Sequence, residues 1–121
     1  MSRVLFVDDD LRRLVEFRTA FGHSGVEVDL AHGLVTGFIM LNRNNYDFIF
    51  LDEDISTHRV TEDLWGAEYL EQKAKNLNNE ITTVEFVSGP HYNRRVSPDF
   101  ILMKPMIYRA NEIGSILEGT K

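Results

Sequence analysis

Residues 4–10 read Val-Leu-Phe-Val-Asp-Asp-Asp, a continuous apolar run that ends abruptly in three acids. Residues 46–54 have the same arrangement and read Tyr-Asp-Phe-Ile-Phe-Leu-Asp-Glu-Asp. Runs of β-branched and aromatic residues without polar alternation are typical of strands that are covered on both faces. The two stretches therefore predict two inner strands of a sheet, each of which delivers carboxylates at its carboxyl end.

The rest of the chain predicts three more strands, separated by segments with helical spacing. Residues 83–87 and 100–103 are apolar runs, and residues 26–30 alternate, which is typical of a strand nearer an edge. Strands that alternate with helices predict a parallel sheet. The positions that mark the predicted helices are Leu11, Leu14, Val15, Arg18 and Phe21, then Leu34, Phe38, Met40 and Leu41, then Ala67, Tyr69, Leu70, Ala74 and Leu77, and finally Ile107, Ala110, Ile113, Ile116 and Leu117.

The connection between the fourth and fifth predicted strands is too short to continue the alternation of strands and helices. Between Ser88 and Asp99, which adjoin the last two predicted strands, only the ten residues 89–98 remain, and they include two prolines. A crossover helix with its two loops needs a dozen residues or more. We therefore expect the fourth helix to be short or missing.

Four strand ends carry residues that can act together. Asp8 and Asp9 follow the first strand, Asp52 the third, Ser88 the fourth and Lys104 the fifth. In open parallel sheets, ligands bind outside the carboxyl ends of the strands. Crowded carboxylates repel one another unless a cation joins them, and Mg²⁺ prefers oxygen ligands. Asp52 can then attack a phosphorus atom as an anionic nucleophile, while the lysine and the serine hydroxyl hold the phosphoryl oxygens.

Each of these residues alone also has a purely structural interpretation. An aspartate at a strand end is often a turn residue or a helix cap, and Asp10 is placed to cap the helix that starts at Leu11. Ser88 before Gly89 is ordinary turn chemistry, and one Lys-Pro pair means little. The ordered set favours the functional interpretation, because independent strands deliver its members to one edge.

Composition narrows the class of protein. The chain has 121 residues, a formal net charge of −6 and no cysteine. This length predicts one domain over residues 1–121, and the lack of thiols is compatible with a cytoplasmic location. The negative net charge argues against nucleic acid as a partner, because it repels the phosphate backbone. No apolar run approaches the ~20 residues of a membrane span, so we expect neither membrane insertion nor a signal peptide.

Residues 4–10, 46–52, 87–88 and 103–105, in this order, resemble the receiver domain of two-component response regulators. The resemblance covers nearly the whole chain. It implies a flavodoxin-like (βα)5 fold, an α/β doubly wound sheet of five parallel strands in the order 2-1-3-4-5. It also implies Mg²⁺ or Mn²⁺ as the cofactor and a histidine kinase, a phosphotransfer protein or another signalling protein as the partner. The oligomeric state expected is a monomer or a weak dimer.

The resemblance implies a role for each residue of the set. Asp52 matches the phosphorylated aspartate, which is also a metal ligand, and Asp9 matches the other direct carboxylate ligand. Asp8 matches the second acid, which acts through a water. The remaining matches are the backbone carbonyl of Asp54 as a metal ligand, Ser88 as the switch hydroxyl, Lys104 as the invariant lysine, and Pro105, which a cis peptide bond joins to Lys104.

The chain departs from the receiver pattern where receivers transmit their signal. Residues 53–65 form a long loop without the usual proline, the fourth helix is cut down, and Ile101 stands near the usual switch aromatic. No output domain is expected. Residues 51–55, Leu-Asp-Glu-Asp-Ile, also partly resemble a divergent receiver-like group proposed to process cyclic phosphates.

Three functions remain open on the sequence. The first is a stand-alone receiver that accepts a phosphoryl group on Asp52 in a phosphorelay, with no catalysis beyond its own phosphorylation and dephosphorylation. The second is a pseudo-receiver, a protein-interaction module that signals without phosphate. The third is a small Mg²⁺-dependent phosphatase or cyclic-phosphate-processing protein.

Overall fold

The computed structural model describes residues 2–23, 25–53, 55, 66–89 and 98–119. These residues form a five-stranded sheet in which all neighbouring strands are parallel, in the order β2-β1-β3-β4-β5. The predicted fold class and strand order are therefore confirmed, and the alternating stretch forms the edge strand β2. The strands are β1 (Ser2–Asp8), β2 (Val26–His32), β3 (Phe48–Asp52), β4 (Thr82–Val87) and β5 (Phe100–Met103).

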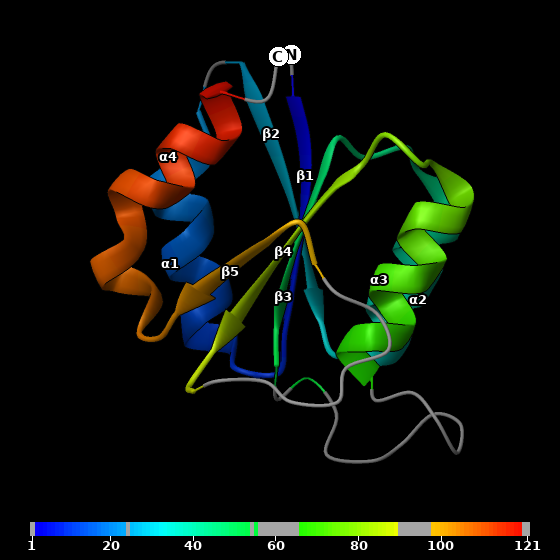
Figure 1. Ribbon diagram of the computed structural model, residues 1–121, viewed down its shortest axis with the longest axis horizontal. Helices are drawn as coiled ribbons and strands as arrows, with labels where there is room; N and C mark the ends of the chain where they lie inside the picture. The colour runs from blue at the N-terminus through cyan, green and yellow to red at the C-terminus, as the bar shows by residue number, and fades with distance from the viewer. Residues whose placement is uncertain (1, 24, 54, 56–65, 90–97, 120–121) are drawn as a thin grey trace.

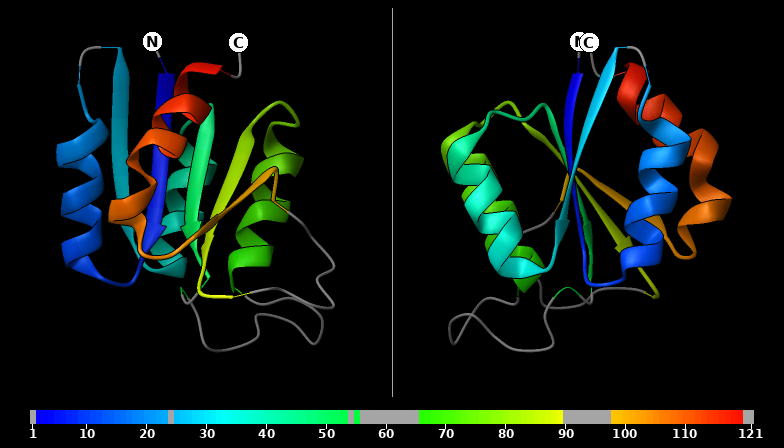
Figure 2. Two further views of the ribbon diagram at one scale, coloured as in Figure 1. Left: turned by 60° about the vertical axis from the view of Figure 1, so that its left-hand side comes forward. Right: turned by 180° about the vertical axis from the view of Figure 1, so that it is seen from behind.

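Helices cover both faces of the sheet. Helices α1 and α4 pack on one face, and α2 and α3 on the other (Figures 1 and 2). Between β4 and β5 no helix is found in the described residues, and residues 90–97, on which the expectation of a reduced fourth helix falls, lie outside them. The helices are α1 (Leu11–Phe21), α2 (Leu34–Arg43), α3 (Gly66–Leu77), the 3-10 helix η1 (Met106–Arg109) and α4 (Ala110–Gly119).

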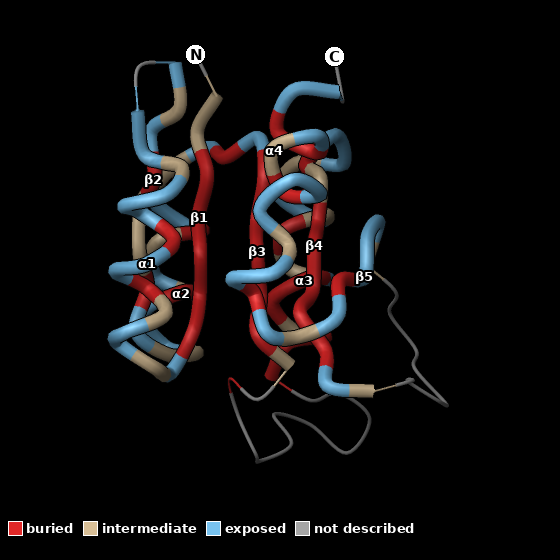
Figure 3. Tube along the Cα trace, turned by 90° about the vertical axis from the view of Figure 1, so that its left-hand side faces the viewer, coloured by how far each residue is buried: buried red, intermediate tan, exposed pale blue. Residues whose placement is uncertain are grey.

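Side chains of the inner strands alternate between two apolar layers. In β1, Phe6 enters the layer beneath α1 and α4, and Leu5 enters the layer beneath α2 and α3. The ring of Phe17, on α1, lies 4.6 Å from the ring of Phe6 and 5.1 Å from that of Phe50. Burial of one such side chain contributes about 1.5–3 kcal/mol. Figure 3 shows that β1, β3 and β4 are buried along most of their length, so the strands that carry the acids are firmly placed.

Helix α1 buries a different stripe from the one predicted. Leu14 and Phe17 are buried against the sheet, whereas Leu11 and Val15 are 63% and 55% exposed. The reason is that the apolar arc of α1 is wider than the face that the sheet covers. Leu11 and Val15, which the periodicity placed on one stripe with Leu14, therefore lie outside the buried face, and Leu77 at the end of α3 is likewise exposed.

Helix α2 approaches β1 closely at Gly37. A Cβ atom at this position would lie 3.1 Å from both methyl carbons of Val7 and 3.3 Å from Cδ1 of Leu70. The glycine weakens the helix by its propensity, but its missing side chain permits this contact. Gly37 therefore has a packing role that the helical pattern alone did not reveal.

The longest described helix, α3, has 12 residues, and a membrane span needs about 20. Among the described residues, no helix is both long and apolar enough to cross a bilayer.

Candidate functional site

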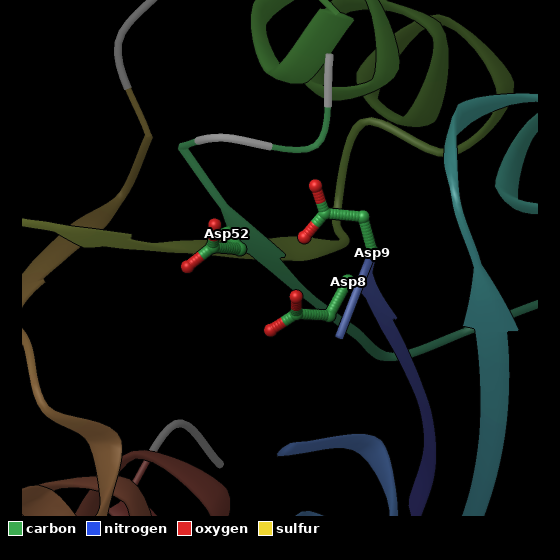
Figure 4. A group of neighbouring side chains, drawn as sticks. All are labelled: Asp8, Asp9 and Asp52. Atoms are coloured by element: carbon green, nitrogen blue, oxygen red, sulfur yellow. The ribbon is translucent and has the colours of Figure 1, made fainter. Parts of the chain in front are cut away.

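Three aspartates meet where β1 and β3 end. The two strands are neighbours and pair Val7 with Leu51, so the residues that follow, Asp8 and Asp52, lie side by side. Asp9 comes next on the chain after β1. One carboxylate oxygen from each aspartate lies within 4.8 Å of the others. Figure 4 shows the three side chains at the two strand ends, as the sequence predicted for this edge of the sheet.

The three carboxylates differ in their surroundings. Asp8 and Asp52 are each 1% exposed, whereas the side chain of Asp9 is 51% exposed. Partial burial, a hydrogen bond with Asp8 and the negative charge of Asp8 raise the pKa of Asp9 above its ordinary value, and the charge of Arg13 only partly opposes this. The acids therefore repel one another, and a nearby cation stabilises their ionised forms.

Arg13 supplies one such cation from the first turn of α1. Its Nε donates to Oδ2 of Asp8 over 2.8 Å, and its Nη2 donates to Oδ1 of the same carboxylate over 3.0 Å. The Nη2 atom also lies 3.6 Å from Oδ1 of Asp9 and 4.0 Å from Oδ2 of Asp52. The hydrogen bond with Asp8 raises the pKa of Arg13 above its already high ordinary value. Sequence reasoning missed this residue, although its spacing of four from Asp9 on a helix start was a signal.

The first turn of α1 is oriented by its cap. Asp10 accepts hydrogen bonds from the backbone amides of Arg12 and Arg13, over 2.9 and 3.4 Å. These bonds satisfy amides that the helix leaves without an internal partner. Asp10 therefore acts as the predicted N-cap, and it fixes the turn from which Arg13 reaches the acids.

Lys104 supplies the second cation from the end of β5. Its Nζ lies 2.9 Å from Oδ1 of Asp52, and its backbone amide donates to the carbonyl of Val87 over 2.8 Å. The bond between Lys104 and Pro105 is cis. Asp52, the residue proposed as the phosphoryl acceptor, therefore carries an ion pair with the lysine that the sequence assigned to the phosphoryl group.

Ser88 bonds to Glu53 rather than directly to Asp52 or Lys104. Oε1 of Glu53 accepts from the hydroxyl of Ser88 over 2.5 Å and from its backbone amide over 2.6 Å. The same oxygen lies 3.9 Å from Nζ of Lys104. Sequence reasoning gave Glu53 no role, because the direction of a side chain just beyond a strand is not encoded in the strand pattern.

A small cavity lies between these side chains. Its volume is about 90 Å³, which corresponds to roughly three waters at about 30 Å³ each. Apolar rings form part of its wall, which strengthens the interactions between the charges. It is lined by Phe6, Asp8, Arg13, Asp52, Phe86, Lys104, Pro105 and Met106.

The donor set fits a small hard cation. Three carboxylates offer oxygen ligands at one point, and Mg²⁺ is bound through one or two carboxylates while it keeps several waters. Asp54, whose backbone carbonyl was the other expected ligand, lies outside the described residues.

Several solved structures share this fold. No protein-family model matches the sequence, and no curated protein matches it. The chain is similar to a CheY-like receiver domain from Methanospirillum hungatei, with 20% identity and a TM-score of 0.75 over 99% of this chain and 96% of the other. It is similar to the response regulator TrrA from Thermotoga maritima in complex with Mg²⁺-BeF, with 18% identity and a TM-score of 0.74 over 100% of both chains. TrrA in complex with the histidine kinase ThkA matches with 18% identity and a TM-score of 0.71, over 99% of this chain and 98% of the other.

The chain therefore adopts the fold of CheY-like response-regulator receiver domains. At 18–20% identity the likeness is one of fold. The particular residues at the strand ends carry the functional argument, because one fold serves many activities.

Proposed function

We propose that this chain is a receiver module that accepts a phosphoryl group on Asp52 with the help of Mg²⁺ or Mn²⁺, and that residues 1–121 form the receiver unit. The observation that carries the proposal is the convergence at Asp52. A carboxylate oxygen from each of two further aspartates lies within 4.8 Å of an oxygen of Asp52, and the Lys104 ammonium lies 2.9 Å from Asp52. This set provides a nucleophile, a cation site and a counter-charge for the incoming group.

The residues divide the reaction between them. A carboxylate oxygen of Asp52 attacks the phosphorus of a phosphohistidine or a small acyl phosphate. A bond forms between this oxygen and phosphorus, and the bond from phosphorus to the histidine nitrogen, or to the oxygen of acetate, breaks with its electron pair. Lys104 is placed to pair with the phosphoryl charge, and the Ser88 hydroxyl to donate to one of its oxygens. The divalent cation, held by Asp8, Asp9 and Asp52, supplies charge neutralisation when bound.

We propose that the phosphodonor is a histidine kinase that docks beside the pocket. The relative TrrA is known in complex with a histidine kinase. In this chain an apolar groove of about 710 Å³ runs between α1 and η1 and shares Met106 with the acidic pocket. Leu11, Val15 and Ile107, exposed by 55–66%, line it. A donor helix on this groove would carry its histidine to the mouth of the pocket.

The proposal is tested by nuclear magnetic resonance with beryllium fluoride, a phosphoryl mimic. With Mg²⁺ present, we expect beryllium fluoride to shift the amide signals of Asp8, Ser88 and Lys104. Asp52→Asn removes the anionic oxygen and should abolish these shifts. Equal shifts in the wild type and in Asp52→Asn would contradict the assignment of Asp52.

A second candidate is a pseudo-receiver that signals without phosphate. Two observations favour it: Ser88 bonds to Glu53, and Ile101, which is 51% exposed, stands near the switch-aromatic position. This candidate predicts partner binding that is unchanged by Asp52→Asn and by removal of Mg²⁺. A pull-down with the wild type and the variant, with and without a chelator, separates the two candidates.

A further inference from the structure

The acidic pocket already contains a cation that belongs to the chain. Both oxygens of Asp8 accept hydrogen bonds from Arg13, and Oδ1 also accepts from the backbone amide of Asp10 over 2.9 Å. The guanidinium lies within 4.0 Å of the other two acids as well. Arg13 thus contacts the same three carboxylates that form the candidate metal site.

Arg13 and a divalent cation make competing demands on these oxygens. The three acids carry three negative charges, and Arg13 with Lys104 returns two positive charges. A metal ion bound beside Arg13 and Lys104 would repel both cations at short range, although Asp10, 3.4 Å from Nη1 of Arg13, and Glu53, 3.9 Å from Nζ of Lys104, offset part of that charge. Lone pairs that hold the guanidinium are also the ones that a metal or its waters would use.

Arg13 and Lys104 differ in how easily their side chains can move out of the pocket. Arg13 comes from the rim, on the first turn of α1, and its side chain is 35% exposed. The side chain of Lys104 is 20% exposed and lies on the acceptor itself. A long arginine side chain at a rim can turn into solvent without moving its helix.

We propose that Arg13 is the resident counter-ion of the pocket and that a divalent cation binds by displacing it, so that Arg13 sets the metal affinity. This inference rests on the proposed function, because it assumes a metal site at Asp8, Asp9 and Asp52. In the metal-free state the Arg13 guanidinium stays paired with the buried Asp8 carboxylate. In the metal-bound state its guanidinium leaves Asp8 for the solvent.

Calorimetric titration with Mg²⁺ tests the affinity. Arg13→Gln should lower the Kd by roughly tenfold or more, because a unit charge next to the site is removed. The matched control is Arg12→Gln, which makes the same change of charge at a neighbouring exposed residue that lines the groove rather than the pocket. It should change the Kd by less than about twofold, since exposed charges are screened.

An unchanged Kd in Arg13→Gln, or an equal change in both variants, overturns the role of Arg13 but leaves the metal site standing. Failure of all three proteins to bind Mg²⁺ overturns both the inference and the proposed function.

A measurement on the wild type serves where Arg13→Gln fails to fold. In the presence of a chelator, the Nε proton of Arg13 should exchange slowly with water. It should lose this protection from exchange when Mg²⁺ saturates the site. The control is the Nε–H of Arg3, which belongs to an ion-pair group with Glu27 and Asp29 near the other end of β1 and should not respond. An Arg13 signal that keeps its protection at saturating Mg²⁺ shows that the guanidinium stays on Asp8, and it overturns displacement.

Discussion

At the scale of single residues, the pocket is an arrangement of charges that balance one another. Asp8 and Asp52 are almost fully buried, and burial of a charged group is costly unless partners replace its water. Arg13 forms an ion pair with Asp8, and Lys104 forms one with Asp52. Glu53 adds a further negative charge, 3.9 Å from the lysine, and holds the hydroxyl of Ser88.

Glu53 should therefore compete with an incoming phosphoryl group. Its carboxylate already takes the Ser88 hydroxyl that the phosphoryl group would need. We expect Glu53→Gln to tighten the Mg²⁺-dependent binding of beryllium fluoride by at least about fivefold, which is the effect of one charge at about 4 Å under full screening by water. Fluorine resonance of the bound complex measures the affinity. The exposed Glu27→Gln, with the same change of charge near the other end of β1, should have no effect, and an equal response in both variants would refute the competition.

The members of this pocket differ in how far the sequence predicted them. Asp8, Asp9, Asp52 and Lys104 were predictable, because the carboxyl ends of parallel strands meet at one edge. Arg13 was not, because its role depends on how the first turn of α1 is aimed at the strand end. The carbonyl of Asp54 stays a prediction, since Asp54 lies outside the described residues.

At the scale of elements, the predicted strands and helices were confirmed. What the sequence did not predict was which side chains of a helix are buried and which are exposed. A strand buried on both faces leaves a strong apolar signal. On α1, by contrast, the apolar arc covers both the core contact and the groove, and periodicity alone cannot divide them. Gly37 shows the same limit, because its value lies in a contact with β1 and not in its helix.

The contact between α2 and β1 gives a paired prediction at two glycines. Gly37→Val should lower the free energy of unfolding by about 1–3 kcal/mol, because its side chain would overlap the methyl groups of Val7. At Gly114, within α4, an added Cβ atom would meet no other atom within 4 Å, and Gly114→Ala should stabilise the protein by about 0.5–1 kcal/mol through helix propensity. Urea unfolding measures both changes. Destabilisation of similar size at the two positions would mean that packing against Val7 is not the cause.

Asp99 gives a pH-dependent prediction at the start of β5. Its Oδ2 accepts from Nζ of Lys75 over 2.8 Å and from the backbone amide of Thr83 over 2.9 Å. Partial burial alone would raise the pKa of Asp99, but these partners hold it below its ordinary value. The resulting stability is present above the unfolded-state pKa of about 3.9 and is lost as the pH falls through the lower folded-state pKa.

Asp99→Asn should therefore cost about 1 kcal/mol at neutral pH, a modest value because the pair is partly exposed. The difference between wild type and variant should shrink below about pH 4, where the wild-type carboxylate takes up a proton. Urea unfolding at both pH values provides the measurement. A difference that is constant with pH would indicate that the charge of Asp99 does not stabilise the fold.

At the scale of the whole molecule, the parallel sheet brings distant parts of the chain to one edge. Residues from β1, β3 and the ends of β4 and β5 meet there, and the groove beside α1 opens next to the same cavity. The fold thus places the apolar groove beside the cluster of acids. This placement follows from the topology, whereas the depth of the groove could not be predicted from the sequence.

The groove predicts a difference between protein donors and small donors. Val15→Glu places a charge in the apolar groove. A panel of autophosphorylated histidine kinases is first screened for a donor that is active on the wild type. Phosphoryl transfer from that donor to Val15→Glu should fall at least tenfold. Acceptance from acetyl phosphate should be unchanged, because the pocket is intact. The control is Val35→Glu on α2, which is 71% exposed on the opposite face. Equal loss in both variants, or loss with acetyl phosphate as well, would argue against docking at the groove.

The central claim is that Asp52 is the phosphoryl acceptor, and intact-mass spectrometry with acetyl phosphate and Mg²⁺ tests it most directly. The account predicts the addition of one phosphoryl group to the wild type, located on Asp52 by fragmentation and absent with a chelator. The same addition should occur in Asp47→Asn, which lies just before the opposite end of β3, and it should be absent in Asp52→Asn. No addition to the wild type, or an equal addition to Asp52→Asn, would contradict the account.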